Sequence, residues 1–170
     1  MKDIVLVGAG KIGSTIARLL SDTGDYRLAV VDRSPEQLRL VETSDRIKTA
    51  VMEITDAAFG SVLAGAYAVL SAAPYQLTTT IAQAAAHAGV HYLDLTEDVR
   101  STREIRAIAA GARSAFLPQC GLAPGFVSIV AYDLASRFET LDSVRMRVGA
   151  LPQYPSNALN YNLTWSTDGV

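Results

Sequence analysis

Three glycines in the segment GAGKIG follow a short apolar run and open a segment with helical periodicity. At this spacing the first glycine permits a tight turn, the second lets the backbone approach a pyrophosphate, and the third lets a helix pack closely on a strand. The free N–H groups and the dipole of the helix start then favour an anion. The pattern therefore predicts a dinucleotide site. Its loop residues are Gly8, Gly10, Lys11, Ile12 and Gly13.

The second apolar run ends in an acid, Asp32, as the dinucleotide-binding fingerprint requires. Its carboxylate can accept hydrogen bonds from both ribose hydroxyls of NAD. Arg33 follows directly and could instead meet the 2′-phosphate of NADP. Because the carboxylate would repel that phosphate, we predict NAD as the cofactor, with NADP as the alternative.

Apolar runs alternate with helix-period segments along most of the chain. Strands are expected at 3–7, 26–32, 49–54, 66–73, 91–96 and 115–118, and helices at 10–24, 34–42, 56–65, 78–89 and 99–114. Near-continuous apolar strands separated by helices indicate a parallel sheet covered on both faces. The rhythm predicts an α/β fold with a Rossmann-type, doubly wound parallel sheet.

The segments after the strands are further site candidates, because a dinucleotide lies across the carboxyl ends of the strands in such folds. Small residues after the fourth strand would let the nicotinamide ribose approach closely. Asp56 could contact the adenine, but it could equally well be the N-cap of the next helix. The additional cofactor-binding residues predicted at this edge are Thr55, Asp56, Ser71, Ala72, Ala73 and Pro74.

Tyr75, Glu97 and Cys120 follow the fourth, fifth and sixth strands and are the predicted catalytic residues near the reacting carbon. Each has a plainer interpretation. Tyr75 could pack on the next helix, Glu97 could be a solvated carboxylate, and Cys120 could be a small buried apolar residue. Asp98 is a candidate cap for the next helix, whereas Asp94, if buried, needs donors and would be structural.

The segment PQCGLAPGFVS, at 118–128, leads from the sixth strand to an amphipathic helix expected at 125–139. A proline at a helix start is pre-organised and leaves the first N–H groups free. We expect these donors to face the nicotinamide side of the cleft, and we include Leu122 and Pro124 among the cofactor-binding residues. A hinge between domains that needs glycine accounts for the same segment.

Apolar residues then alternate with Arg145 and Arg147, which predicts a strand over 143–152. Either arginine could bind a substrate carboxylate, or both could be solvated or interfacial. The change of pattern predicts an NAD(P)-binding Rossmann domain at 1–122. Residues 123–170 would begin a second, mixed α+β domain for substrate binding or dimerisation.

The composition of the chain argues against binding to nucleic acids, metals and membranes. The chain has 170 residues, a net charge of −2 and no dense basic stripe, which argues against nucleic-acid binding. A single cysteine cannot form an internal disulfide, and His87 and His91 lack the further ligands that zinc needs, so we predict no metal. Because no apolar run approaches the roughly 20 residues of a membrane span, we expect no membrane partner and a cytoplasmic location.

Four segments together resemble the saccharopine dehydrogenase-like family, which includes saccharopine reductases, lysine 6-dehydrogenases and carboxynorspermidine dehydrogenases. They are VLVGAGKIGSTIARLL, AAPYQLTTTIAQAAAHAGVHYLDLTED, LPQCGLAPGFVSIVAYDLA and YNLTWSTDGV. The first is generic to dinucleotide binders, whereas CGLAPG is the most specific. The resemblance implies a Rossmann domain joined to a mixed domain, hydride transfer at a carbon–nitrogen bond of an amino-acid-like substrate, and a homodimer in the full-length form.

Relatives of this type continue beyond TWSTDGV through the rest of a second domain. We therefore expect residues 1–170 to bind the dinucleotide but to catalyse poorly. The alternative function is a nucleotide-sensing regulatory Rossmann domain of the potassium-transport type, whose pattern does not predict CGLAPG. A noncatalytic dimerisation remnant is a third hypothesis.

Overall fold

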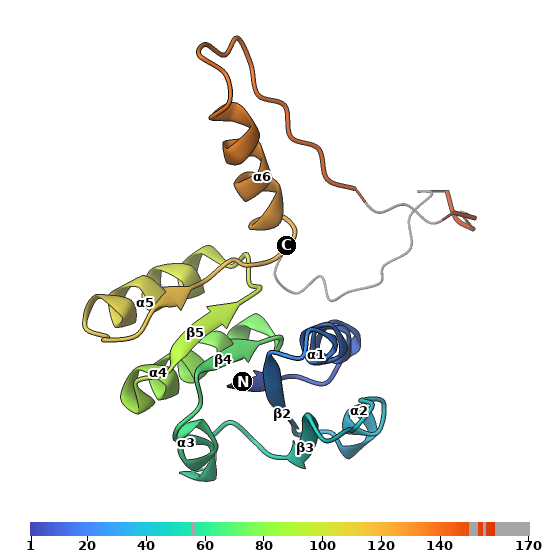
Figure 1. Ribbon diagram of the computed structural model, residues 1–170, viewed down its shortest axis with the longest axis vertical. Helices are drawn as coiled ribbons and strands as arrows, with labels where there is room; N and C mark the ends of the chain where they lie inside the picture. The colour runs from blue at the N-terminus through green and yellow to red at the C-terminus, as the bar shows by residue number, and fades with distance from the viewer. Residues whose placement is uncertain (56, 150–152, 155, 159–170) are drawn as a thin grey trace.

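The computed structural model describes residues 1–55, 57–149, 153–154 and 156–158. A six-stranded sheet with the order β3-β2-β1-β4-β5-β6 forms its centre, and every neighbouring pair of strands is parallel (Figure 1). The strands are β1 (Lys2–Val7), β2 (Tyr26–Asp32), β3 (Ile47–Val51), β4 (Ala68–Ser71), β5 (His91–Asp94) and β6 (Phe116–Leu117). The predicted Rossmann-type, doubly wound sheet is confirmed.

The strand order reverses at β1, which pairs with β2 on one side and with β4 on the other. Val7 is in register with both Val31 and Ser71. Because the strands are parallel and end at nearly the same level, the loops that follow them open at one edge of the sheet. This edge, at the switch point, is where ligands bind in open α/β sheets.

Helices cover both faces of the sheet. The helical elements are α1 (Lys11–Asp22), α2 (Pro35–Leu38), α3 (Ala57–Leu63), the 3-10 turn η1 (Tyr75–Leu77), α4 (Thr78–Ala88), α5 (Val99–Ala110) and α6 (Phe126–Ala135). One core cluster contains Ala17 of α1 and Leu38 of α2. The other contains Phe59 of α3, Ile81 of α4 and Ile105 of α5. Burial on both faces explains why the strands read as apolar runs.

Most elements are shorter than their expected bounds, and β3 and α2 depart from them in an informative way. The third strand lies earlier, at 47–51 rather than 49–54. The helix expected at 34–42 shortens to the single turn α2. Its start signals act as predicted, because the Ser34 hydroxyl accepts a hydrogen bond from the Gln37 N–H at 3.3 Å and a proline occupies the first turn.

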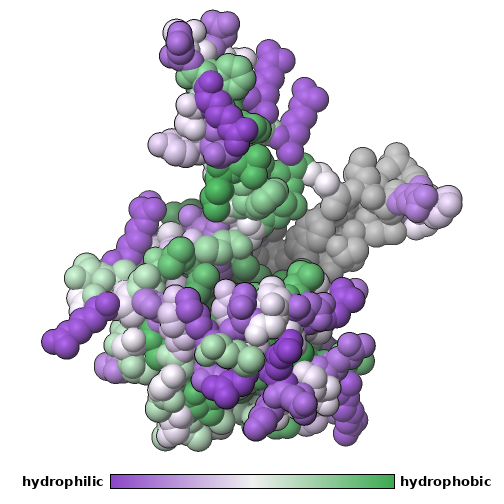
Figure 2. Space-filling view, viewed as in Figure 1, coloured by the Kyte–Doolittle hydropathy of each residue, from purple (hydrophilic) through white to green (hydrophobic). Residues whose placement is uncertain are grey.

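Helix α6 projects away from the sheet and packs on neither of its faces (Figure 1). None of its residues is buried, and Phe126, Ile129 and Tyr132 are exposed. Together with residues 140–149, α6 lines a groove of about 850 Å³. In Figure 2 hydrophobic side chains gather over the half of this projecting part that lies nearer the sheet, whereas its tip is mostly hydrophilic. Within the described residues, α6 therefore presents an uncovered apolar surface.

The strand predicted over 143–152 does not form at 143–149, and 150–152 lie outside the described residues. A strand needs a neighbour that pairs its backbone groups. Residues 143–149 lie beside α6 instead, and a helix has no backbone edge to offer. The alternation of apolar and charged residues was therefore an insufficient signal. None of the helices in the described part of the chain combines the length and apolar character that crossing a bilayer requires.

Candidate functional site

The glycine loop after β1 makes two close backbone contacts. Gly8 has a φ of 102°, which residues with a side chain avoid. A Cβ on Gly8 would lie 2.7 Å from the carbonyl oxygen of Ala72, and a Cβ on Gly13 would overlap the carbonyl oxygen of Gly8. The two glycines therefore let the loop, the start of α1 and the end of β4 pack in direct contact.

Gly10 is different, because beyond its own chain neighbours no atom lies within 4 Å of the position that its Cβ would take. It is the N-cap of α1, with no side-chain cap and no acidic residue in the first turn. Lys11 and Ile12 are exposed at the same helix end. The first N–H groups of a helix lack partners within it, and those of Lys11, Ile12 and Gly13 have none among the described residues, so an anion can accept from them. This arrangement fits the pyrophosphate of a dinucleotide.

Asp32, the last residue of β2, is half-buried. Its Oδ2 accepts a hydrogen bond from the Ala9 N–H at 2.7 Å, and its Oδ1 accepts from the Ser34 N–H at 2.8 Å. The carboxylate thus ties the glycine loop to the loop after β2, a role that the fingerprint did not predict. Because each carboxylate oxygen has a second acceptor site, this bridge is compatible with a contact to ribose.

Two of the three remaining residues predicted beside the second and third strands are solvent-exposed. Arg33 and Thr55 are exposed, and Asp56 lies outside the described residues. Arg33 makes no ion pair within the described part of the chain. Its guanidinium is therefore available to an incoming group next to Asp32.

The small residues after β4 lie against the glycine loop. Ala72 and Ala73 are half-buried, and the Ala72 carbonyl faces Gly8. Ser71 is buried, and its hydroxyl has no hydrogen-bond partner among the described residues. Pro74 is exposed. The small side chains of these residues thus lie next to the glycine loop at the switch point.

The three predicted catalytic side chains come from three neighbouring loops. Tyr75 is half-buried in η1, and Glu97 is exposed after β5. Cys120 is exposed too, so its interpretation as a small buried residue is wrong. Its Sγ lies 3.3 Å from the Leu117 carbonyl oxygen. Among the described residues, no hydrogen bond joins the three side chains to one another.

The surroundings raise the pKa of the Cys120 thiol. Partial burial in the loop is the larger cause, and the negative charge of Asp94 is the second. Both disfavour the thiolate. At neutral pH the thiol is therefore held protonated, which suits a proton donor better than a nucleophile.

The N–H groups at the start of α6 are not free, contrary to the prediction. The Phe126 N–H donates to the Gly121 carbonyl at 2.9 Å, and the Val127 N–H donates to the Leu122 carbonyl at 3.0 Å. Gly125, with a φ of 128°, folds the loop back onto itself, and a Cβ there would overlap the Gly121 carbonyl oxygen. The loop therefore uses these donors internally.

The other two predicted contacts in this loop are Leu122 and Pro124. Leu122 is exposed, and Pro124 is half-buried after a cis peptide bond. Asp98, in the loop after β5, caps α5 as expected, because its carboxylate accepts from the Ser101 N–H at 2.6 Å. The Ser101 hydrogen bond also lowers the pKa of Asp98.

A buried polar network beneath the three loops was only partly foreseen. Asp94 is fully buried, and its carboxylate accepts from the Tyr92 hydroxyl at 2.8 Å and from the N–H groups of Thr96 and Gln119 at 3.0 Å each. The aspartate inside the apolar run YLDLT was the available signal, since a buried carboxylate needs donors. Its partner in the next loop, Gln119, gave no signal in the sequence.

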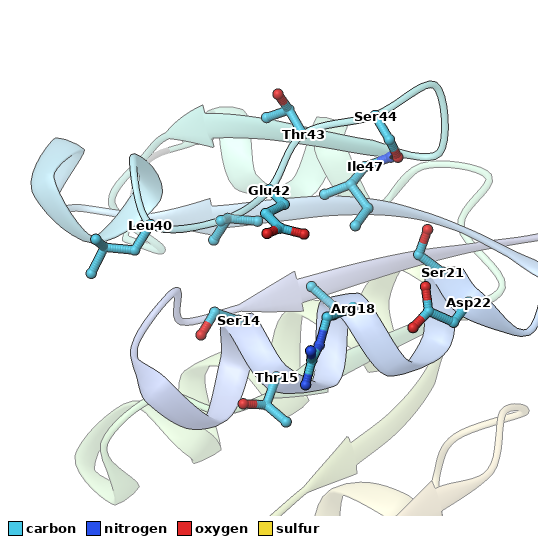
Figure 3. Close-up of a pocket in the computed structure, with 12 residues that line it drawn as sticks. Ser14, Thr15, Arg18, Ser21, Asp22, Leu40, Glu42, Thr43, Ser44 and Ile47 are labelled. Carbon is cyan, nitrogen blue, oxygen red and sulfur yellow. The ribbon is translucent and has the colours of Figure 1, made fainter.

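A separate groove of about 360 Å³ lies between α1 and the segment 40–47 (Figure 3). Arg18 of α1 and Glu42 on the opposite side are among the side chains that line it. None of the predicted site residues belongs to this groove. The described residues also contain no cluster of three or more histidine, cysteine or acidic side chains that could hold a metal ion.

Comparison with known proteins gives both a family and structural relatives. A family model described as saccharopine dehydrogenase NADP binding domain matches residues 4–117. Apo histidine-tagged saccharopine dehydrogenase (L-Glu forming) from Saccharomyces cerevisiae is similar, with a TM-score of 0.76 and 20% identity over 98% of this chain and 39% of that chain.

Two other dehydrogenases share the fold. Shikimate dehydrogenase from Mycobacterium tuberculosis matches with a TM-score of 0.53 and 16% identity, over 69% of this chain and 45% of that chain. The WlbA dehydrogenase from Bordetella pertussis, in complex with NADH and UDP-GlcNAcA, matches with a TM-score of 0.59 and 18% identity, over 79% of this chain and 42% of that chain.

At these identities the solved structures establish the fold alone, and this chain spans only 39% of the length of the yeast protein. The family match covers the glycine loop, Asp32 and the strands β4 and β5. It supports NAD(P) as the cofactor, in agreement with the open N-terminus of α1. The chain therefore belongs to the saccharopine dehydrogenase NADP-binding domain family.

Proposed function

We propose that this chain is the NAD(P)-binding part of an oxidoreductase that acts on a carbon–nitrogen bond of an amino-acid-like substrate. The single observation that carries the proposal is the N-terminus of α1, which has no side-chain cap and where a Cβ on Gly10 would contact only its chain neighbours. The family match supports the dehydrogenase class. The CGLAPG segment supports the choice of a saccharopine- or lysine-type substrate through the family resemblance.

NAD is the favoured dinucleotide in this proposal. The Asp32 carboxylate lies at the end of β2 and would repel a 2′-phosphate. The exposed Arg33 is the group that would accept NADP. The family description names NADP, so a direct comparison of the two cofactors decides this point.

The bound nicotinamide supplies hydride chemistry, and the chain supplies position and protons. Ala72 and Ala73 leave room for the ribose beside the glycine loop. Tyr75, Glu97 and Cys120 are proposed to exchange the proton of the substrate nitrogen. The raised pKa of the Cys120 thiol favours it as a donor.

Residues 1–122 would form the cofactor domain, and 123–170 would begin a substrate and dimerisation domain. The uncovered apolar surface of α6 and residues 140–149 supports this division, since such surfaces are buried in complete domains or interfaces. The full-length protein is then expected to be a homodimer. Arg145 and Arg147, both exposed, would be available to a substrate carboxylate.

Binding without turnover is the second candidate function. It is favoured by one observation, namely that Tyr75, Glu97 and Cys120 are not joined into a hydrogen-bonded set in the described structure. A nucleotide-sensing domain would need only the glycine loop and Asp32.

Titration with NADH and NADPH, followed by nicotinamide fluorescence, tests the cofactor proposal. We expect saturable binding of both and tighter binding of NADH. Failure to bind either dinucleotide would refute the proposal. Hydride transfer assayed with lysine, saccharopine and related imines then separates the candidates, with slow turnover expected for residues 1–170 and none for a sensor.

A further inference from the structure

Asp94 and Asp32 occupy equivalent positions in the two halves of the sheet. Each is the last residue of its strand, β5 or β2. Each carboxylate accepts the N–H of the residue two positions later, Thr96 at 3.0 Å and Ser34 at 2.8 Å. Each also accepts an N–H from the loop after the adjacent strand. Asp32 therefore organises the cofactor half, and Asp94 has the same bonds on the other half.

The adjacent-loop contact of Asp94 reaches the predicted catalytic cysteine. Its Oδ1 accepts from the Gln119 N–H at 3.0 Å, and its backbone carbonyl accepts from the Cys120 N–H at 2.8 Å. Gln119 has a φ of 63°, a left-handed conformation that such residues adopt only where their surroundings hold them. The backbone immediately before Cys120 is thus held in an unfavourable conformation by Asp94.

A second set of contacts extends from Asp94 to the loop of Tyr75. Oδ2 of Asp94 accepts from the Tyr92 hydroxyl at 2.8 Å, and that hydroxyl lies 3.3 Å from the Thr78 carbonyl oxygen. The Thr78 hydroxyl in turn donates to the Tyr75 carbonyl at 2.6 Å. Burial and the charge of Asp94 both raise the pKa of Tyr92, so it stays a donor at neutral pH. The Tyr92 hydroxyl has one proton, which it gives to Asp94, so Asp94 bonds the loops after β5 and β6 directly and only approaches the loop after β4 through Tyr92.

Asp94 is fully buried, whereas Asp32 is half-buried. Because it is buried, Asp94 acts through the loops that it bonds rather than by contact with a ligand. We propose that Asp94 is a positioning residue that holds the loops after β5 and β6 in one arrangement and sets the place of the Cys120 thiol at the cofactor edge. The functional value of the Cys120 position rests on the proposed function, whereas the contacts of Asp94 are present without any ligand.

The single cysteine of the chain makes this arrangement measurable, since any thiol reaction reports Cys120 alone. The rate of alkylation by iodoacetamide against pH gives the midpoint of the thiol titration. Hydrogen exchange at the Thr96 and Gln119 amides reports whether their acceptor is present. The other ionisable groups on the three loops are Tyr75, Glu97 and Asp98, and they stay unchanged in every variant.

Asp94→Ala removes the acceptor, so exchange at both amides should accelerate at least about tenfold while exchange in β1 and β2 stays as in the wild type. Asp94→Asn keeps an acceptor oxygen and should restore most of that protection. It also removes a charge that raises the pKa of the thiol, so the alkylation midpoint should move to lower pH. Asp3→Asn is the control, since it removes an equal charge from an exposed ion pair with Arg27.

Two results would overturn the proposal. One is unchanged exchange at Thr96 and Gln119 in Asp94→Ala, or an equal loss of protection throughout the sheet. The other, which holds even if Asp94→Ala does not fold, is an alkylation midpoint in Asp94→Asn that matches Asp3→Asn. Because neither measurement uses a cofactor or substrate, a failure here leaves the dinucleotide titration to judge the proposed function separately.

Discussion

The Asp32 carboxylate oxygen Oδ2 lies 2.7 Å from the backbone nitrogen of Ala9, so the residue that ends β2 also holds the glycine loop. The same side chain is the predicted ribose ligand. In the proposed function, discrimination between cofactors and the shape of the pyrophosphate loop would therefore depend on one carboxylate.

Asp32→Asn should weaken NADH binding about tenfold or more. The asparagine has only one acceptor oxygen for the N–H groups of Ala9 and Ser34, so the other N–H would face the amide NH₂, and the remaining acceptor would carry no charge. The affinity for NADPH should fall less, since repulsion of the 2′-phosphate disappears. Parallel fluorescence titrations measure the ratio. Arg33→Gln is the matched control and should weaken NADPH alone. An equal loss for both cofactors in Asp32→Asn would contradict a role in discrimination.

Gly13 and Gly10 should respond differently to alanine. Gly13→Ala places a Cβ on the Gly8 carbonyl oxygen, so the free energy of unfolding should fall by about 1–3 kcal/mol. Gly10→Ala meets open space at an ordinary φ of −65°, so the loss should stay below about 1 kcal/mol. Gly10→Ala should nevertheless weaken NADH binding, because its methyl group enters the pyrophosphate space. Urea unfolding of both variants measures their stabilities, and titration with NADH measures their affinities. A Gly13→Ala variant that is more stable than Gly10→Ala would refute the packing argument.

The cap of α5 should depend on pH. The Ser101 hydrogen bond lowers the pKa of Asp98 in the folded protein below the ordinary value of 3.8. A carboxylate whose pKa is lower in the folded than in the unfolded protein stabilises the folded state at pH values above its unfolded pKa. This stabilisation is lost as the pH falls through the pKa of the folded state. Asp98→Asn keeps a capping oxygen without a titrating group.

Urea unfolding from about pH 7 down to about pH 3 compares these two proteins. The stability difference between wild type and Asp98→Asn should be largest near neutrality and should shrink in the acid range. A difference that is constant with pH would show that the charge of Asp98 contributes nothing to the cap.

The apolar surface of α6 should bind a hydrophobic dye without contributing to the stability of the sheet domain. Ile129 is 68% exposed, so Ile129→Glu should lower the fluorescence of bound anilinonaphthalene sulfonate and change the unfolding free energy by less than about 0.5 kcal/mol. Ile105→Ala, in the core under α5, is the contrast and should cost about 2–5 kcal/mol. A large loss of stability in Ile129→Glu would mean that α6 is packed.

Local pattern was sufficient for the sheet because buried parallel strands and capped helices have strong signals. The runs 3–7 and 26–32 match β1 and β2 closely, and Ser34 starts α2 as expected. The alternation at 143–149 misled because strand formation also requires a pairing neighbour, which is a property of the whole fold.

The glycine loop and Asp32 were predictable as a site because their spacing reflects the shape of the ligand. The bond of Asp32 to Ala9 and the bond of Asp94 to Gln119 were not, since they join residues far apart in the chain. The donors at the start of α6 were misjudged for a related reason. Their acceptors are loop carbonyls brought close by the positive φ of Gly125, which no helix-start rule includes.

Along the chain, the residues proposed to select the dinucleotide come before the residues proposed for proton transfer. The first set is Gly10, Asp32 and Arg33, and the second lies between Tyr75 and Cys120. Their loops meet where Gly8 faces the Ala72 carbonyl. In the proposed function, mutations that change cofactor choice and mutations that change proton transfer would therefore lie in separate stretches of the gene. A recombination crossover between relatives within codons 34–67 would exchange one set and leave the other whole, provided that glycine and a small residue are kept on either side of that contact.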